Sequence, residues 1–147
     1  NVKSLFFLTK ALAKPLRAAA SPERPAKVIN IASIDGIFVN PGETYSYAAS
    51  KAAVIHLTRR LATKLIKDNI NVTAIAPGAF ASDMNRAARD KSDELAKRIP
   101  SRRIGTDEDM AGIAIYLASR AGDYVVGNTI AVDGGVVYAN AGLEISG

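Results

Sequence analysis

Tyr47 and Lys51 stand four residues apart in a stretch that reads as helix, so their side chains should share one helix face. An ammonium group beside a phenol stabilises the phenolate, which makes the phenol a better proton donor and acceptor near neutral pH. Such a pair can move a proton onto or off an alcohol oxygen by general acid–base catalysis. Ser33, fourteen residues upstream, follows an apolar segment and could donate a hydrogen bond to the same oxygen.

The Tyr-x-x-x-Lys spacing is weak evidence by itself, because helices often carry such a pair as a solvated contact. Nearby residues also offer rival groups. Tyr45 has Ala49 four residues after it and therefore lacks a lysine partner. Ser46 and Ser50 are alternative hydroxyls, and Ser50 should point about 100° away from the face of the tyrosine–lysine pair.

Apolar segments on both sides of this pair predict the strands that position it. Nearly continuous apolar runs are typical of parallel strands that are covered on both faces. The predicted strands span residues 28–32, 70–76 and 130–132, and the predicted helices span residues 2–20, 45–68 and 106–119. Helices that alternate with strands imply an α/β protein with a parallel sheet.

The remaining segments predict loops and caps. Pro15 is expected to kink or end the regular part of the first helix. Residues 34–44 contain glycine and proline and predict a loop. Residues 79–104 are polar and weakly periodic, which predicts a mobile lid. Thr106 precedes three acidic residues, so it should cap the next helix.

The order of strand, Tyr-x-x-x-Lys helix, strand and Pro77-Gly78 resembles the short-chain dehydrogenase/reductase family. The resemblance runs from Asn1 to the Asp-Gly-Gly turn at residues 133–135, but it covers only the second half of that family's fold. The long stretch at residues 19–26 is similar to the rhamnolipid-type 3-oxoacyl reductases. The resemblance implies a doubly wound, Rossmann-like parallel sheet, of which this chain holds three strands with flanking helices.

The resemblance also implies a reaction, the interconversion of a carbonyl and a secondary alcohol with NAD(P)(H). In that reaction Tyr47 would be the acid/base. Lys51 would tune the tyrosine and hydrogen-bond the nicotinamide ribose, and Ser33 would hold the substrate oxygen. Asn1 would order a water that links Lys51 to solvent.

Residues 77–82 resemble the family's Pro-Gly-x-x-x-Thr segment beside the nicotinamide. Backbone groups near Phe80 would meet the carboxamide, and the Ser82 hydroxyl would meet the carboxamide or a phosphate. Serine keeps the hydroxyl of the usual threonine but loses its stiffening methyl group. The implied cofactor-binding residues are Tyr47, Lys51, Pro77, Gly78, Phe80 and Ser82. His56 should lie about 180° around the helix from the tyrosine and face away from the site.

The family's glycine-rich turn, which receives the dinucleotide pyrophosphate at a helix N-terminus, has no counterpart in these 147 residues. We therefore expect residues 1–147 to be the C-terminal part of a single dinucleotide-binding reductase domain, inactive in isolation. The residues that select NADH or NADPH follow the family's second strand, outside this chain. NADP(H) is slightly favoured.

Composition argues against several other functions. The net charge is +5, but the basic residues are spread out without interleaved aromatic residues, which argues against nucleic-acid binding. A chain with no cysteine and one histidine has no basis for thiolate catalysis or a histidine metal cluster. No apolar run approaches the ~20 residues of a membrane span. We expect a cytoplasmic protein without a metal.

The substrate remains open between several classes. Overall resemblance favours a 3-oxoacyl thioester, although Asp68 after Lys67 weakens the case for docking an acidic carrier protein. A sugar, polyol or steroid-type alcohol is the alternative within the class. The alternative from another class is a dinucleotide-binding sensor or an inactive fragment.

A homodimer or homotetramer is also expected, joined through the helices at residues 2–20 and 45–68. Leu57, Leu61 and Leu65 continue an apolar stripe beyond the active-site end of the second helix. An apolar stripe that the sheet cannot cover tends to pair with a copy of itself. The alternative is that these leucines fill the core of their own subunit.

Overall fold

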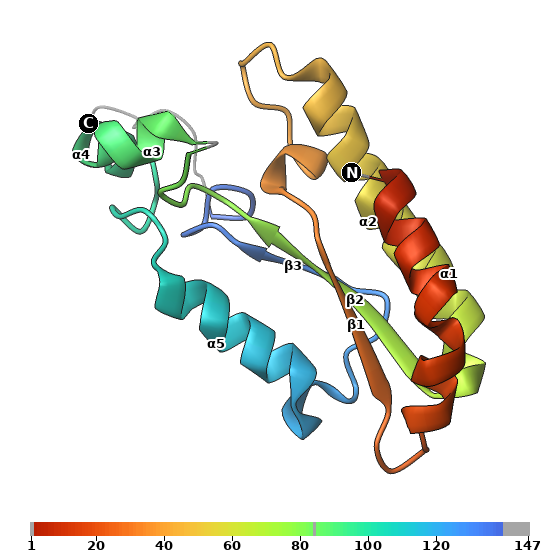
Figure 1. Ribbon diagram of the computed structural model, residues 1–147. Helices are drawn as coiled ribbons and strands as arrows, with labels where there is room; N and C mark the ends of the chain where they lie inside the picture. Colours follow the sequence, from red (N-terminus) through yellow and green to blue (C-terminus); the bar gives the residue numbers. More distant parts are fainter. Residues whose placement is uncertain (1, 84, 140–147) are drawn as a thin grey trace.

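The computed structural model describes residues 2–83 and 85–139, which form a three-stranded parallel sheet with helices on both faces (Figure 1). The strands are β1 (Ala26–Ile31), β2 (Ile70–Pro77) and β3 (Thr129–Val132), and β2 lies in the centre. Ala26 pairs with Ile70, and Ala74 pairs with Thr129. The predicted parallel α/β sheet with three strands is thus confirmed.

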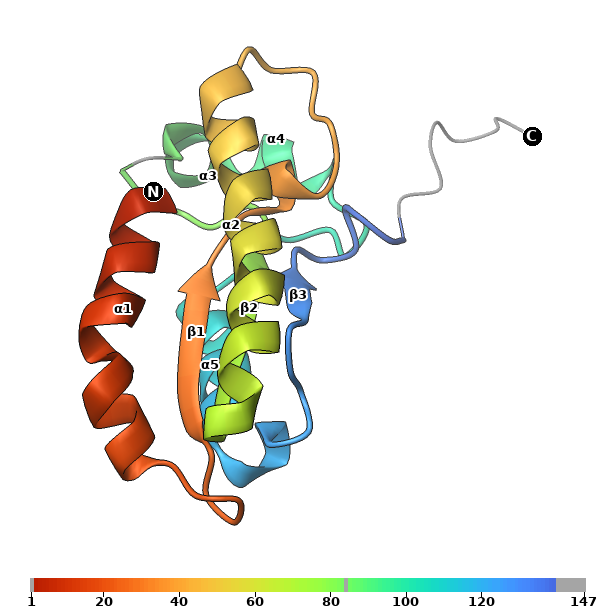
Figure 2. The same ribbon diagram turned by 90° about the vertical axis from the view of Figure 1, so that its right-hand side faces the viewer.

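The helices make two layers around this sheet. The longer ones are α1 (Val2–Ala19), α2 (Tyr45–Leu65) and α5 (Asp107–Ala118). The described chain also contains short helices α3 (Arg86–Asp90) and α4 (Ser92–Ala96), and 3-10 turns η1 (Ile34–Gly36), η2 (Ile66–Asp68) and η3 (Arg120–Gly122). Helices α1 and α2 cover one face of the sheet and α5 covers the other (Figures 1 and 2).

The structure adds detail to three expectations about individual segments, of which the predicted helix at 2–20 is confirmed as α1. Helix α1 does not end at Pro15 but continues to Ala19. Pro15 and Ala11 are both exposed, so water can satisfy the carbonyl that the proline leaves without a partner. The predicted loop at 34–44 begins with the turn η1, and the predicted lid at 79–104 contains α3 and α4. Five-residue helices are too short to display the period that identifies a helix in sequence.

The predicted helix at 45–68 is regular only to Leu65, after which η2 tightens the last turn. Asn69 then adopts a left-handed conformation with φ of 55°, which turns the chain into β2. By contrast, Thr106 caps α5 as predicted, because its side chain and that of Asp109 form a reciprocal capping box.

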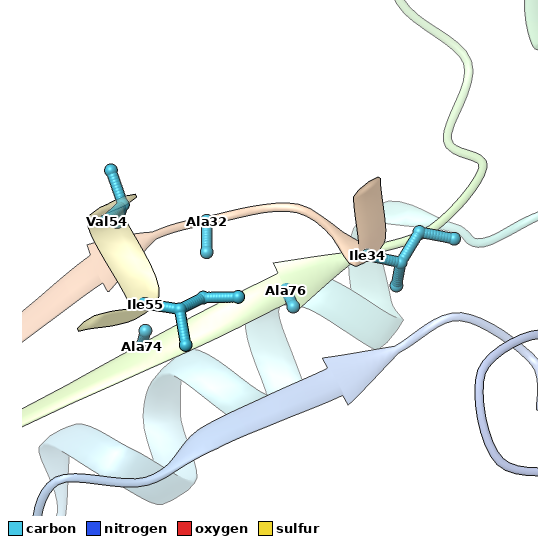
Figure 3. Close-up of a cluster of buried hydrophobic side chains, with 6 residues drawn as sticks. All are labelled: Ala32, Ile34, Val54, Ile55, Ala74 and Ala76. Atoms are coloured by element: carbon cyan, nitrogen blue, oxygen red, sulfur yellow. The ribbon is translucent and has the colours of Figure 1, made fainter. Parts of the chain in front are cut away.

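Two clusters of buried apolar side chains hold α2 against the sheet. The cluster nearer the carboxyl ends of the strands contains Ala32, Ile34, Val54, Ile55, Ala74 and Ala76 (Figure 3). The other contains Ala62, Leu65, Ile70 and Val72. Together they fix the start of α2 beyond the carboxyl ends of β1 and β2, where ligands bind in open α/β sheets.

The second cluster also accounts for part of the leucine stripe on α2. Leu65 is buried, and Leu61 packs against the cluster. These two leucines therefore fill the core of their own chain, as the alternative interpretation held. Leu57 is half-buried.

A polar link joins β1 to α2 inside this core. The Asn30 Nδ2 donates to the Thr58 Oγ1 at 2.9 Å, and the Thr58 hydroxyl donates to the Val54 carbonyl at 2.9 Å. Both side chains are buried. In the sequence Asn30 is only a polar residue within an apolar run, and its partner lies 28 residues away.

We expect Thr58→Val to destabilise the protein by about 1–3 kcal/mol, because it leaves the buried Asn30 amide without an acceptor. Thr63→Val is the matched control. Thr63 makes the same kind of bond, to the Arg59 carbonyl, but is exposed, so its replacement should cost less than about 0.5 kcal/mol. Urea denaturation measures both. Equal effects of the two substitutions would contradict the importance of the Asn30 link.

Candidate active site

A cavity of about 490 Å³ lies beyond the carboxyl ends of β1 and β2. Its lining comes from the turn after β1, the start of α2 and the segment after β2. The lining residues are Ser33, Asp35, Thr44, Tyr47, Ser82 and Asn85. Three residues that were predicted from separate parts of the sequence, Ser33, Tyr47 and Ser82, therefore lie around one space.

Lys51 lies beside Tyr47 on α2, as their spacing predicts. Its Nζ is 5.6 Å from the centre of the Tyr47 ring and donates a hydrogen bond to the Ile31 carbonyl at 3.0 Å. Partial burial lowers the pKa of the Lys51 ammonium. The lysine thus bridges α2 and the end of β1, with its charge close to the phenol ring.

Ser33 is buried at the end of β1 and caps the turn η1. Its Oγ accepts a hydrogen bond from the Asp35 N–H at 3.2 Å. Because a serine hydroxyl can accept and donate at once, the Ser33 O–H can still donate a hydrogen bond to a ligand oxygen. The cap thus fixes the position of the Ser33 hydroxyl and leaves its O–H group free to donate.

Gly36, which sequence reasoning missed, sets the distance between this turn and α2. A Cβ at Gly36 would lie 2.6 Å from the Lys51 carbonyl carbon and 2.7 Å from the Ala52 nitrogen. Only a glycine lets the turn rest directly on the backbone that carries Lys51. The one signal in the sequence is a glycine three residues after Ser33.

The segment that begins at Pro77 is held mainly by its neighbours in the fold. Gly78 N–H donates to the Val132 carbonyl at 2.9 Å, and a Cβ at Gly78 would lie 2.7 Å from the Asp133 Cα. The Phe80 ring lies against Gly105. These contacts give Gly78 and Phe80 structural roles whether or not a cofactor touches them.

Ser82 is the residue of this segment that reaches the cavity. Its Oγ accepts a hydrogen bond from the Asn85 N–H at 3.1 Å, and the Asn85 Oδ1 accepts one from the Ala88 N–H at 3.1 Å. Asn85 therefore helps to begin α3 while it lines the cavity.

The alternative tyrosine and serines of the sequence analysis are not among the residues that line this cavity. Tyr45 is 78% exposed, and Ser46 is also exposed. The Ser50 hydroxyl donates to the Tyr47 carbonyl at 2.8 Å. His56 is exposed and lines a different cavity, as its position on the helix predicts. Asn1 lies outside the described residues.

Comparison with known proteins identifies the family. The family model described as enoyl-(acyl carrier protein) reductase matches residues 1–137. The chain is 45% identical over 138 residues to the rhamnolipids biosynthesis 3-oxoacyl-[acyl-carrier-protein] reductase of Pseudomonas aeruginosa, covering 92% of this chain and 54% of that protein. The chain belongs to the short-chain dehydrogenase/reductase family.

A second relative in the short-chain dehydrogenase/reductase family has a different name. The chain is 46% identical over 138 residues to a 2-dehydro-3-deoxy-D-gluconate 5-dehydrogenase of Dickeya dadantii, covering 92% of this chain and 53% of that protein. The chain thus spans about half the length of the curated relatives it matches.

A solved short-chain dehydrogenase/reductase structure has the same fold. The Pseudomonas aeruginosa RhlG/NADP active-site complex superposes with a TM-score of 0.86 at 43% identity, over 92% of this chain and 56% of that one. The predicted Rossmann-like fold is confirmed for the part that this chain contains.

Three cavity residues were not predicted from the sequence as members of a short-chain dehydrogenase/reductase site. Thr44 precedes α2, and Asn85 precedes α3, so helix capping alone would explain both residue types. Asp35 follows Ser33 within one turn, which is the only sign that it reaches the same cavity.

Within residues 2–83 and 85–139, no group of three or more histidine, cysteine, aspartate or glutamate side chains is placed to hold a metal ion. No helix of that part of the chain has the length and apolar character that crossing a bilayer requires.

Proposed function

We propose that the full-length protein is an NAD(P)(H)-dependent oxidoreductase that interconverts a carbonyl and a secondary alcohol. Residues 1–147 would form the C-terminal part of its single dinucleotide-binding domain. The observation that carries the proposal is the convergence of Ser33 and Tyr47 on one cavity, with the Lys51 ammonium beside the Tyr47 ring.

In the reductive direction Tyr47 gives its phenolic proton to the substrate carbonyl oxygen. Ser33 donates a hydrogen bond to the same oxygen and stabilises the negative charge that develops there. Lys51 stabilises the phenolate that remains on Tyr47, because its positive charge is fixed nearby by the bond to the Ile31 carbonyl. The oxidative direction uses the same groups in reverse.

The residues around the cavity fit a nicotinamide. Tyr47 and Ser82 line one cavity, and the Lys51 ammonium lies beside the Tyr47 ring. They would hold the ribose and the carboxamide, together with the backbone at residues 77–80. When bound, the nicotinamide supplies or accepts the hydride. NADP(H) is favoured over NAD(H), because the similar RhlG structure is described as an NADP complex.

A 3-oxoacyl thioester is the first candidate substrate, because a relative at 45% identity is named as a 3-oxoacyl-[acyl-carrier-protein] reductase. A sugar acid or polyol is the second, because a relative at 46% identity is named as a 2-dehydro-3-deoxy-D-gluconate 5-dehydrogenase. The two identities are too close to decide between the classes.

We expect the full-length protein to oxidise NADPH when it is given a panel of carbonyl compounds that includes 3-oxo esters and keto sugars. Absorbance at the nicotinamide band measures the reaction. Binding of NADPH without turnover of any carbonyl would favour a dinucleotide-binding sensor instead. The isolated chain of residues 1–147 serves as the control and should bind no dinucleotide at micromolar concentration in a calorimetric titration, because it has no glycine-rich pyrophosphate turn.

The proposed assembly is a homodimer or homotetramer, for which α1 offers an apolar surface. Phe6, Phe7, Leu8 and Leu12 are all more than 40% exposed on this helix. Contiguous exposed apolar side chains of this size commonly mark a protein–protein contact. Leu57 on α2 is half-buried and could extend that surface.

We expect the substitution pair Leu8→Glu and Leu12→Glu to lower the molar mass of the full-length protein in light scattering to half or less. Two buried charges in a self-complementary contact would oppose association. Val39→Glu is the control, because Val39 is 95% exposed in a loop outside α1, and this substitution should leave the mass unchanged. A wild-type monomer at micromolar concentration would contradict the proposed assembly.

A further inference from the structure

The cavity beside Tyr47 has an unbalanced charge. Asp35 is the only charged residue among those that line it in the described part of the chain, and the lining contains no lysine, arginine or histidine. Lys51 adjoins the cavity but directs its ammonium to the Ile31 carbonyl. Among the side chains that line this space, a ligand therefore meets one carboxylate and otherwise neutral groups, with the Lys51 ammonium beside the Tyr47 ring.

The Asp35 carboxylate has no hydrogen-bond or ion-pair partner within the described residues. The Asp35 backbone N–H donates to Ser33, but its side chain makes no hydrogen bond or ion pair there. The acidic residues that adjoin lining residues in the sequence, Glu43 and Asp83, do not line the cavity. Glu43 is exposed, and Asp83 is already paired with Arg89 at 2.8 Å.

The position of Asp35 is also well fixed. It lies in the first turn of η1, between the Ser33 cap and the close contact of Gly36 with the backbone of α2. Because Ser33 would hold the substrate oxygen, a residue two positions later in the same turn lies near the reacting carbon. Its charge therefore acts on whatever the substrate carries at that carbon.

We propose that Asp35 is a specificity-determining residue that selects carbonyl substrates without an anionic group within about two carbons of the reacting carbon. The inference rests on the proposed function and refines its substrate class. Repulsion between two like charges several ångströms apart near a protein surface changes an equilibrium constant on the order of tenfold. An uncharged 3-oxo thioester or ester satisfies this selection, whereas a small 3-oxo acid, whose carboxylate is one methylene away from the carbonyl carbon, does not.

The test compares two substrates that differ in charge, ethyl 3-oxobutanoate and 3-oxobutanoate, with the full-length enzyme and NADPH. We expect wild type to favour the ester, and Asp35→Asn to shift the ratio of kcat/KM toward the acid on the order of tenfold. Asparagine keeps the size of the side chain and removes only its charge. Salt at 1 M should narrow the wild-type preference, since the Debye length then falls to about 3 Å.

Glu43→Gln is the matched control, because it removes an acidic charge next to Thr44 but outside the cavity lining, and it should leave the ratio within about twofold of wild type. If neither compound is turned over, inhibition constants of the pair against a carbonyl that the enzyme does reduce give the same ratio. A ratio unchanged by Asp35→Asn, in an enzyme that reduces carbonyls, overturns this inference alone. A full-length protein that reduces no carbonyl overturns the proposed function and this inference with it.

Discussion

Replacing Tyr47 with phenylalanine should lower kcat of the full-length protein by about 10²–10⁴-fold, the contribution of a general acid–base group. The ring and its contact with Lys51 remain, and only the hydroxyl of this cavity-lining residue is lost. Folding should be unaffected, and NADPH binding should change little. Steady-state kinetics, with calorimetry for NADPH, separates lost chemistry from lost binding.

The matched control for this substitution is Tyr45→Phe. Tyr45 lies two residues earlier on the same helix, is 78% exposed and does not line the cavity. It should retain wild-type kcat. If Tyr47→Phe retains more than half of the activity, the proton donor must be another group, and the assignment of Tyr47 is wrong.

The second large effect should come from Gly36→Ala, a substitution that touches no reacting group. The added Cβ would lie 2.6–2.8 Å from backbone atoms of Lys51 and Ala52, so η1 or α2 must move. Overpacking of this kind costs about 1–3 kcal/mol of stability. A displacement of about 1 Å between Ser33 and the helix that carries Tyr47 can also lower kcat/KM about 10²-fold.

Gly112→Ala is the control for Gly36→Ala, because a Cβ at Gly112 meets nothing within 4 Å. Gly112 lies inside α5, where alanine should stabilise the helix by roughly 0.5–1 kcal/mol. Thermal melting and kcat/KM of both variants give the comparison. Wild-type stability and activity in Gly36→Ala would mean that the contact between η1 and α2 does not position the site.

Much of the fold follows from local patterns in the sequence. Continuous apolar runs identify the strands, and the Thr106 cap identifies the start of α5. The short helices α3 and α4 were not predicted, because five residues are too few to show a helical period. The leucine stripe of α2 was ambiguous, because periodicity reveals an apolar face but not whether the core or another subunit covers it. Only the contacts of Leu61 and Leu65 place those two residues inside.

The candidate site divides in the same way. Tyr47, Lys51 and Ser33 could be predicted as candidate site residues. Their spacing, and their positions on a predicted helix and at the end of a predicted strand, can be recognised in the sequence alone. Asp35 and Gly36 could not, because their importance depends on where the turn after β1 rests. That position follows from packing between residues that are 15 or more positions apart.

The buried bond between Asn30 and Thr58 has a meaning beyond its contribution to stability. Apolar contacts are tolerant of sliding, and α2 could move by one helical turn of about 5.4 Å along the sheet while keeping most of its small buried side chains covered. The hydrogen bond between Asn30 and Thr58 forms only when the two side chains are opposite each other, so it opposes this movement. Since Asn30 precedes Ser33 by three residues and Thr58 lies on the same helix as Tyr47, one hydrogen bond outside the cavity helps to set the position of Ser33 relative to Tyr47.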